Sequence, residues 1–507
     1  MRTMQREDFE RLLADRPVVP VTRVLFADGE TPVGLYRKLA AGRPGTFLLE
    51  SAEQGGVWSR FSFIGVDCFG VLGQEGDRAA WWGAALPAER LLDVPVSDLA
   101  PLEAVSAVYR RWASPAIPGF PPLTGGLVGY IGWEAVRQLE HLPDVPPADY
   151  EVPGQALVFV SELIVLDHRD GTVVLVANCL NDGREDVESM WADSQRRLDR
   201  LQEGLARPSA VSVGTLDVSA QPAPRARTRR EDFLASVDAA KEHIREGDIF
   251  QVVISQRFEQ DCPAEPIDVY RALRVLNPSP YMYLLSLEGP AGPYAIVGSS
   301  PEALVKVTEG RVMTHPIAGS KPRGADPEED LALEQSLLGD EKERAEHLML
   351  VDLARNDLLR VCEAPSVAVT EFMRVERFSH IMHIVSTVEG TLRAGRDAVD
   401  VFRATFPAGT LSGAPKPRAL EIIDELEPAQ RGVYGGVVGY FGLTGDADLA
   451  IAIRTATIID RVAYVQAGGG LVADSDPQSE FQESQNKAAA PLRAVAVANS
   501  LREVAAS

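Results

Sequence analysis

Apolar residues follow two different periods along this chain, and the two periods separate strands from helices. Runs rich in β-branched and aromatic residues at 46–51, 156–167 and 172–180 predict buried strands. The stretch 186–205 is long and charged, with apolar residues at helical spacing, and predicts a helix. A new unit begins where Thr228 and Glu231 have the spacing of a capping box, before a helix that Gly247 closes.

The segment between these two helices, 206–227, is rich in Pro, Ser and Ala and has little periodicity. It is typical of a linker or a surface crossing. We therefore expect an N-terminal domain over 1–205, a linker over 206–227 and a second domain over 228–507. The second domain opens with a helix and the strand-like DIFQVVISQRF, and its apolar, glycine-rich segment 432–442 predicts a strand where backbones approach closely.

Composition and charge narrow the function classes. The chain has 507 residues and a formal net charge of −23, which disfavours binding to nucleic acid or to an anionic membrane. An anionic small substrate would need a local cation. There is no run of about 18 apolar residues and no apolar leader, and the four cysteines form no C-x-x-C pair, so we expect a cytoplasmic protein.

Two pairs of glutamates lie on predicted helical faces. Glu480 and Glu483 precede Lys487, and residues at i, i+3 and i+7 share one face of a helix. Glu343 and Glu346 repeat the spacing in an earlier helical segment. Each pair alone is typical of a solvated face, whereas together they predict four carboxylates around one divalent cation, for which Mg²⁺ is the best candidate.

Other polar positions allow two interpretations. The loops at 298–304, 314–324 and 406–423 are ordinary turns, or they direct hydroxyls and backbone N–H groups at an anion, and Gly468–Gly470 allows the same choice. Arg454 lies in an apolar run, where an unpaired guanidinium is costly, so a bidentate grip on a carboxylate is attractive. His383 is either a partly buried structural histidine or a proton-transfer group.

These motifs together resemble the chorismate-utilising enzymes, along nearly the whole second half of the chain. The matching segments are SPEAL, PIAGSKPRG, DEKERAEHLMLVDLARND, HIMHIVS, PAGTLSGAPK, RGVYGGVVGYF, DLAIAIRTA and GGGLVADSDPQSEFQESQNKA, with LLES and SRFSFIG in the first half. The resemblance implies an α+β fold in which antiparallel β-sheets are sandwiched with helices and a smaller N-terminal domain packs on the catalytic domain. It is strongest to the branch that makes anthranilate.

The resemblance also implies roles for individual residues. Mg²⁺ would hold the ring carboxylate of chorismate, with Glu346 and Glu483 as direct ligands and Glu343 and Glu480 acting through water. Groups expected to hold substrate are Tyr434, Arg454, Gly468, Gly469, Gly470, Lys487, Ala318, Gly319 and Ser320. Groups expected to do chemistry are His383 at the departing C4 hydroxyl, Glu302 in acid–base work and Thr410 near the ring carboxylate.

Two positions distinguish relatives within the family. Those that use water carry a lysine at the position of Gln251, and many aminodeoxychorismate synthases carry a nucleophilic lysine at that of Ala318. Both lysines are absent, which favours direct attack by ammonia, although some aminodeoxychorismate synthases also lack the second one and remain the alternative. A catalytically inactive regulatory protein is a further alternative. The family motif usually has Thr at Ser320, but the hydroxyl is kept.

The chain lacks the G-x-C-x-G segment of a glutaminase, so a separate glutamine amidotransferase subunit is expected to supply ammonia in a hetero-oligomer, as a heterotetramer. The resemblance further implies feedback inhibition by L-tryptophan. Its expected site combines both domains: Glu50, Ser51, Arg60, Pro280, Tyr281, Met282, Val438 and Tyr440.

Overall fold

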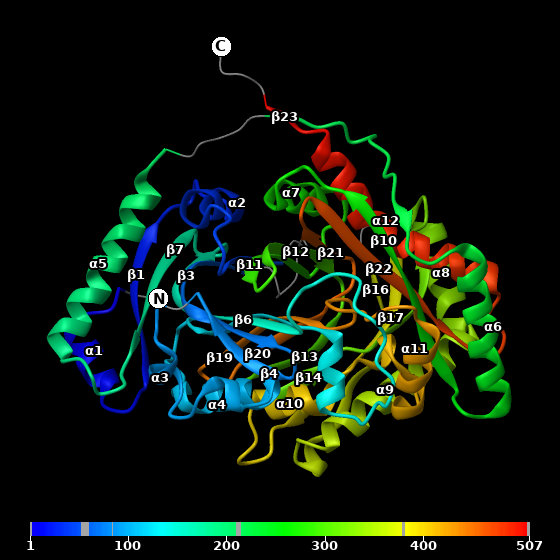
Figure 1. Cartoon of the computed structure of the whole chain (residues 1–507), viewed down its shortest axis with the longest axis horizontal. Coiled ribbons are helices and arrows are strands. Elements are labelled where there is room, and N and C mark those ends of the chain that lie inside the picture. Colours follow the sequence, from blue (N-terminus) through cyan, green and yellow to red (C-terminus); the bar gives the residue numbers. More distant parts are fainter. Residues whose placement is uncertain (1–2, 52–59, 84, 209–213, 378–380, 504–507) are drawn as a thin grey trace.

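The protein is described from a computed structural model, which covers residues 3–51, 60–83, 85–208, 214–377 and 381–503 (Figure 1). The first half contains these elements: α1 (Arg6–Leu13), β1 (Val18–Phe26), α2 (Pro32–Leu35), a π-helical turn (Tyr36–Ala40), β2 (Thr46–Glu50), β3 (Phe61–Glu75), β4 (Arg78–Trp82), α3 (Ala88–Leu91), a 3-10 turn (Val96–Asp98), α4 (Pro101–Trp112), β5 (Gly126–Ile131), a second 3-10 turn (Trp133–Gln138), β6 (Gln155–Asp167), β7 (Thr172–Leu180) and α5 (Val187–Ala206).

Two short strands, β8 (Gly214–Thr215) and β9 (Arg225–Ala226), lie between the halves. The second half contains these elements: α6 (Arg230–Glu246), β10 (Gln251–Asp261), α7 (Pro266–Leu276), β11 (Tyr281–Gly289), β12 (Gly292–Ser300), β13 (Ala303–Thr308), β14 (Arg311–Thr314), β15 (Ile317–Pro322), α8 (Pro327–Gly339), α9 (Glu341–Leu359), a 3-10 turn (Ala364–Ser366), β16 (Ala368–Arg377), β17 (Ile381–Thr391), α10 (Ala398–Thr405), a 3-10 turn (Gly409–Leu411), β18 (Gly413–Ala414), α11 (Lys416–Leu426), β19 (Val437–Gly442), β20 (Ala447–Ile451), β21 (Thr455–Ile459), β22 (Val462–Leu471), α12 (Pro477–Asn499) and β23 (Arg502–Glu503).

The strands of the two halves are hydrogen-bonded to each other. β6 pairs with β3, β5 and β7, and from it the pairing runs through β3 and β2 to β11, and through β5 to β19. Every one of these pairs is antiparallel. The β2–β11 ladder sets Glu50 opposite Met282, and the β5–β19 ladder sets Ile131 opposite Val437. The domain boundary expected at 206–227 stays a prediction, and strands from before and after it pair in the same sheet.

The expected α+β fold of antiparallel sheets and helices is confirmed. The predicted helix 186–205 is α5, whose Asp186 accepts from the backbone N–H of Ser189. The capping box at Thr228 is wrong: the helix starts one residue later, Arg229 is its N-cap without a side-chain cap, and Arg229 pairs with Asp232. No helix of the described residues is long and apolar enough to cross a membrane.

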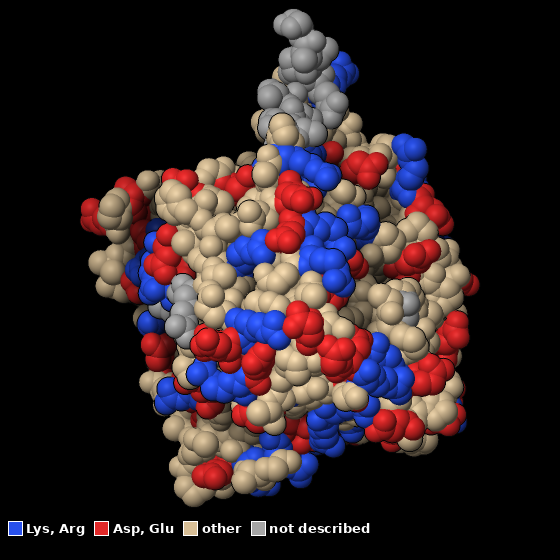
Figure 2. Space-filling view, turned by 90° about the vertical axis from the view of Figure 1, so that its left-hand side faces the viewer, with Lys and Arg blue, Asp and Glu red and all other residues tan. Residues whose placement is uncertain are grey.

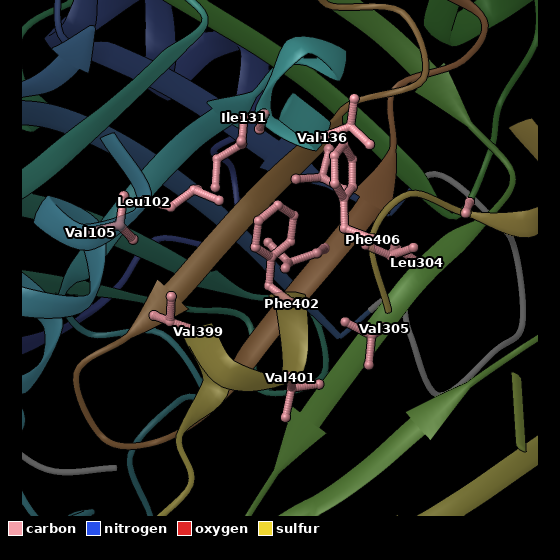
Figure 3. Close-up of a cluster of buried hydrophobic side chains, with 14 of the residues drawn as sticks. Leu102, Val105, Ile131, Val136, Leu304, Val305, Val399, Val401, Phe402 and Phe406 are labelled. Atoms are coloured by element: carbon pink, nitrogen blue, oxygen red, sulfur yellow. The ribbon is translucent and has the colours of Figure 1, made fainter. Parts of the chain in front are cut away.

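A buried apolar cluster contains side chains from both halves of the chain (Figure 3). Phe402 of α10 and the nearby Phe406 meet Leu102 of α4, Ile131 of β5 and Leu304 of β13 in it. Burying one such side chain contributes roughly 1.5–3 kcal/mol. Because Leu304 follows Glu302 closely and Phe406 precedes the Thr410 turn, this packing fixes two groups of the site.

Charged side chains of both signs alternate on the face formed by α1, β1 and α5 (Figure 2). Some of them pair, as Arg23 Nη1 does with Asp199 Oδ1 at 2.7 Å and Arg6 Nη2 with Glu188 Oε2 at 2.7 Å. Surface pairs of this kind are worth about 0–1 kcal/mol each.

Candidate active site

The two glutamate faces converge on adjacent glycines of β22. A Cβ atom placed on Gly469 would lie 2.8 Å from Oε2 of Glu480 and 3.4 Å from Oε1 of Glu483, both on α12. One placed on Gly470 would lie 3.8 Å from Oε1 of Glu346 on α9. Gly469 therefore leaves room for the Glu480 carboxylate, whereas Gly470 leaves room for Gln251, whose Nε2 a Cβ would approach to 2.4 Å.

Electrostatics at these carboxylates favours a cation. Burial raises the pKa of Glu346, Glu343 and Glu480, and like charge adds to the effect: Glu483 acts on Glu346 and on Glu480, and Glu346 acts on Glu343. Oε2 of Glu480 is buried and has no hydrogen-bond partner among the described residues. A buried, unpartnered oxygen on α12, together with the carboxylates whose pKa is raised on α9 and α12, fits a hard divalent cation such as Mg²⁺.

The carboxylate oxygens of the four glutamates do not all lie close to one another. Among the described residues, the group of acidic or histidine side chains whose ligand atoms all lie within 4.8 Å of one another is His243, Glu246 and Asp248, at the end of α6. The four glutamates form no such group, and Nζ of Lys487 lies 2.7 Å from Oε1 of Glu483. Mutual repulsion of carboxylates, with Lys487 as a counter-charge, accounts for this spread.

Three groups meet where β22 faces the start of β21. Nζ of Lys487 donates to the carbonyl of Gly468 at 3.0 Å, and Nη1 of Arg454 donates to the carbonyl of Lys487 at 3.0 Å. Arg454 has a left-handed backbone, with φ of 53°, and burial lowers its pKa. Tyr434 is buried, which raises its pKa to about 12. A cationic, donor-rich wall of this kind suits a carboxylate.

The groups expected to do chemistry are placed by two hydrogen bonds. Oγ1 of Thr410 donates to Oε1 of Glu302 at 2.9 Å, and burial raises the pKa of Glu302 to about 7. Nδ1 of His383 lies 2.9 Å from the carbonyl oxygen of Gly319. A carbonyl only accepts, so Nδ1 carries the proton and Nε2 is the basic nitrogen. Burial lowers the pKa of His383, with smaller contributions from Arg454 and Lys487.

The loop opposite His383 contains a bulge that the sequence did not reveal. The β15–β17 register shifts between Ala318 and Ser320, and Ser320 stands opposite His383. Gly319 at the shift has φ of 70°, where a side chain is strained, and a Cβ there would lie 3.0 Å from Oε2 of Glu343. The bulge turns the Gly319 carbonyl onto His383 and leaves space for Glu343.

The family follows from comparison with known proteins. The model of the chorismate binding enzyme family matches residues 75–493. This chain belongs to that family. It is 53% identical to anthranilate synthase component 1 of Arthrobacter globiformis (98% of this chain, 94% of that protein) and 50% identical to that of Mycolicibacterium smegmatis (99% and 95%). The crystal structure of anthranilate synthase component I from Streptococcus pneumoniae TIGR4 matches with a TM-score of 0.76 and 37% identity, over 87% of this chain and 94% of that one.

The expected inhibitor residues of this chorismate-binding enzyme lie on or next to β2 and β11, which pair directly, and on or next to β3 and β19. Glu50 is buried and accepts from Tyr270 at 2.5 Å and Arg274 at 2.6 Å. Oγ of Ser51 is buried without a hydrogen-bond partner among the described residues. Met282, Val438 and Tyr440 are buried. Tyr281 donates to Asp448 at 2.9 Å, and Pro280 directly precedes Tyr281.

The side chain of Arg60 contacts residues that are not part of the expected inhibitor site. Its Nη2 lies 2.7 Å from Oδ2 of Asp167 and 3.5 Å from Oδ2 of Asp170, and its guanidinium covers the ring of Phe61. A role for Arg60 at the inhibitor site stays a prediction.

Sequence reasoning missed a buried ion pair behind the site. Arg431 donates to both oxygens of Glu427, to the carbonyl of Leu411 at 2.7 Å and to that of Val253 at 2.8 Å. Leu411 adjoins Thr410, and Val253 stands opposite Gly470. The sequence held a signal for this pair, because Arg431 directly precedes the apolar, glycine-rich segment 432–442, and an arginine buried beside such a segment needs a partner, just as Arg454 does.

Proposed function

We propose that this chain is the chorismate-converting subunit, component 1, of an anthranilate synthase. The observation that carries the proposal is the 53% identity to such a component over nearly the full length of both chains. Two residues support it within the site: Gln251, whose Nε2 donates to Oε1 of Glu346 at 3.2 Å, and Ala318. Neither can serve as the lysine base or nucleophile of sister enzymes.

Substrate would be held at two carboxylates. Glu346 and Glu483 would bind Mg²⁺ directly, and Glu343 and Glu480 through water; when bound, Mg²⁺ supplies a positive template and a Lewis acid for the ring carboxylate. At the other end, the guanidinium of Arg454, the hydroxyl of Tyr434 and the amides of Gly468–Gly470 would bind the enolpyruvyl carboxylate.

The reaction proposed has two stages and balances as chorismate plus ammonia giving anthranilate, pyruvate and water. Ammonia forms a bond to ring C2 while the C4–O bond breaks. Nε2 of His383 takes up the proton that the newly bonded nitrogen releases and passes it to the departing hydroxyl, which leaves as water. The C2 proton is then removed, the enolpyruvyl C–O bond breaks, and pyruvate departs as the ring becomes aromatic. Glu302 is suited to acid–base work here, because its pKa lies near neutrality.

Ammonia would come from glutamine through a separate amidotransferase subunit. Burial raises the pKa of Cys68 and Cys179 to about 12 and that of Cys262 and Cys362 to about 11. A thiol of this kind stays protonated near neutral pH, so no cysteine of this chain is suited to attack glutamine. We propose a cytoplasmic hetero-oligomer of the two subunits, as a heterotetramer.

Tryptophan is proposed as a feedback inhibitor. The anionic Glu50 with Arg274 beside it can meet the charged backbone of an amino acid, and the unpartnered hydroxyl of Ser51 can add a hydrogen bond. Met282 and Val438, both buried, would supply apolar contacts for an indole ring. Since β2 pairs directly with β11, a ligand here would act on strands of both halves.

The nitrogen source tests whether glutamine is hydrolysed by a separate subunit and not by this chain. The purified chain with chorismate and Mg²⁺ is expected to make anthranilate from ammonium and none from glutamine, and a cognate amidotransferase subunit should confer use of glutamine. Glutamine hydrolysis by the isolated chain would overturn the assignment of its cysteines.

A further inference from the structure

A small cavity of about 60 Å³ lies behind the Glu302–Thr410 hydrogen bond. Its walls include Thr314 at the end of β14, His315 directly after it, and Leu353 and Ala354 of α9. It has room for a few molecules the size of water, and it is too small for a chorismate ring. It therefore adjoins the candidate acid–base group without being a place for the main substrate.

The cavity has an unsatisfied polar group in its wall. Oγ1 of Thr314 is buried, with the residue 6% exposed, and has no hydrogen-bond partner among the described residues. Leaving a buried hydroxyl unpaired costs about 1–3 kcal/mol. Glu302 offers a second polar group on the same cavity. On the α9 side Leu353 and Ala354 are apolar, and the carboxylate of Asp357 there is paired with Lys416 at 3.2 Å. A small, neutral, polar guest that donates a hydrogen bond to Thr314 fits this lining.

We propose that this cavity holds the ammonia that attacks chorismate, with Thr314 Oγ1 and the Glu302 carboxyl as its hydrogen-bond partners. The inference rests on the proposed function, which makes ammonia the second substrate. Ammonia has three N–H donors and one lone pair, so it can donate to both side chains and keep the lone pair for the ring. Because the cavity lies beside Glu302, the ammonia would be held apart from the sites proposed for Mg²⁺ and for the two carboxylates of chorismate.

A second, larger cavity adjoins the small one. This cavity of about 440 Å³ shares Ala303 and His315 with the small one. Its lining carries three carboxylates, Glu371, Glu376 and Glu389, against one guanidinium, Arg374. An acidic vestibule concentrates ammonium and repels the chorismate dianion, so the two substrates would arrive from different sides. His315 stands at the junction, with Nδ1 3.1 Å from Oγ1 of Thr387 and Nε2 3.6 Å from Oε1 of Glu376.

Steady-state kinetics of Thr314→Val in the full chain test the proposal. Valine keeps the shape and removes only a hydroxyl without a protein partner, so the melting temperature should not fall. The KM for ammonium should rise by roughly 3- to 10-fold, the value of one hydrogen bond, and the KM for chorismate should stay within twofold. Thr308→Val, at an exposed position on the same hairpin, is the matched control and should change neither constant.

A second variant reduces the volume of the cavity and leaves its polar groups unchanged. Ala354→Leu should fill the cavity from α9 and raise the KM for ammonium more than Thr314→Val does, again with little effect on the KM for chorismate. If both variants keep the wild-type KM for ammonium, the cavity holds an ordered water only and the inference is overturned, while anthranilate formation by the wild type would leave the proposed function standing. If the wild type forms no amino product, the proposed function fails, and the ammonia site fails with it.

Discussion

Arg431 and Glu427 form an ion pair, with Nη2 2.6 Å from Oε1, and both side chains are almost completely buried behind the candidate site. The guanidinium also lies over the ring of Trp133 at 4.2 Å and that of Tyr434 at 5.5 Å. One arginine thus ties the Thr410 turn, the strand opposite the glycines and Tyr434 together.

Removing one member of this pair should be costly. Arg431→Met leaves Glu427 buried and uncompensated, so the free energy of unfolding should fall by about 3–5 kcal/mol in a denaturant titration. Arg355→Met, which breaks an exposed pair with Asp352, should cost less than about 1 kcal/mol. Equal losses for the two variants would contradict the role given to Arg431.

Glu302 should make stability depend on pH. Its pKa is raised from 4.5 to about 7 in the folded protein, because the carboxyl is buried. Below pH 4.5 the carboxyl is protonated in both the folded and the unfolded state. As the pH rises towards 7, the unfolded chain loses the proton first, so the free energy of unfolding falls by up to about 3 kcal/mol and stays lower at higher pH. Glu302→Gln stays neutral at every pH, so its advantage in melting temperature over the wild type should be small at pH 5 and larger at pH 8. A constant difference across this range would show that Glu302 has an ordinary pKa.

Much of this site follows from sequence because helical periodicity is local. Glu343 and Glu346 share a face of α9, and Glu480 and Glu483 one of α12, as their spacing predicts. The segment 432–442 is a strand only from Val437, and the close approach expected there is real: a Cβ on Gly439 would meet the carbonyl of Asp448 at 2.0 Å.

What the sequence could not show depends on contacts between distant segments. The bulge at Gly319 arises from the pairing of β15 with β17, and the partners of Arg431 come from three separate elements. At Thr228 the spacing of a capping box is present, but the helix has Arg229 as its N-cap and an Arg229–Asp232 pair in its first turn, and spacing alone does not decide between these two local patterns.

His383 should matter for turnover more than for binding. His383→Ala should lower kcat by roughly 10²–10⁴, because it removes the nitrogen that protonates the departing hydroxyl. The Kd for chorismate, measured by calorimetry, should change much less. His141→Ala, at an exposed position, serves as the control. A variant that binds poorly but keeps its kcat would move His383 from proton transfer to positioning.

The four glutamates should make activity depend on Mg²⁺. Glu346→Gln and Glu483→Gln each remove one negative ligand, so activity should fall by more than about 100-fold with the fold intact by circular dichroism. Glu341→Gln, an exposed neighbour at the start of α9, should keep both activity and Mg²⁺ dependence. Normal turnover of either variant at low Mg²⁺ would rule out the proposed site.

Tryptophan should weaken chorismate binding through the β2–β11 connection. Coupling between two sites is typically about 1–3 kcal/mol and reciprocal, so chorismate should weaken tryptophan binding by the same factor. Ser51→Phe should fill the pocket and relieve inhibition with basal activity kept, whereas Ser219→Phe, at an exposed position, should stay sensitive. An enzyme that ignores millimolar tryptophan, or a fully sensitive Ser51→Phe, would refute this inhibitor site.

The central claim is that this chain turns chorismate and ammonia into anthranilate and pyruvate. The most direct measurement is the stoichiometry of products, by mass spectrometry and proton NMR, after the purified chain has consumed chorismate with ammonium and Mg²⁺. The account predicts one anthranilate and one pyruvate for each chorismate. An amino product that retains the enolpyruvyl group with no pyruvate released, or isochorismate without nitrogen, would contradict it.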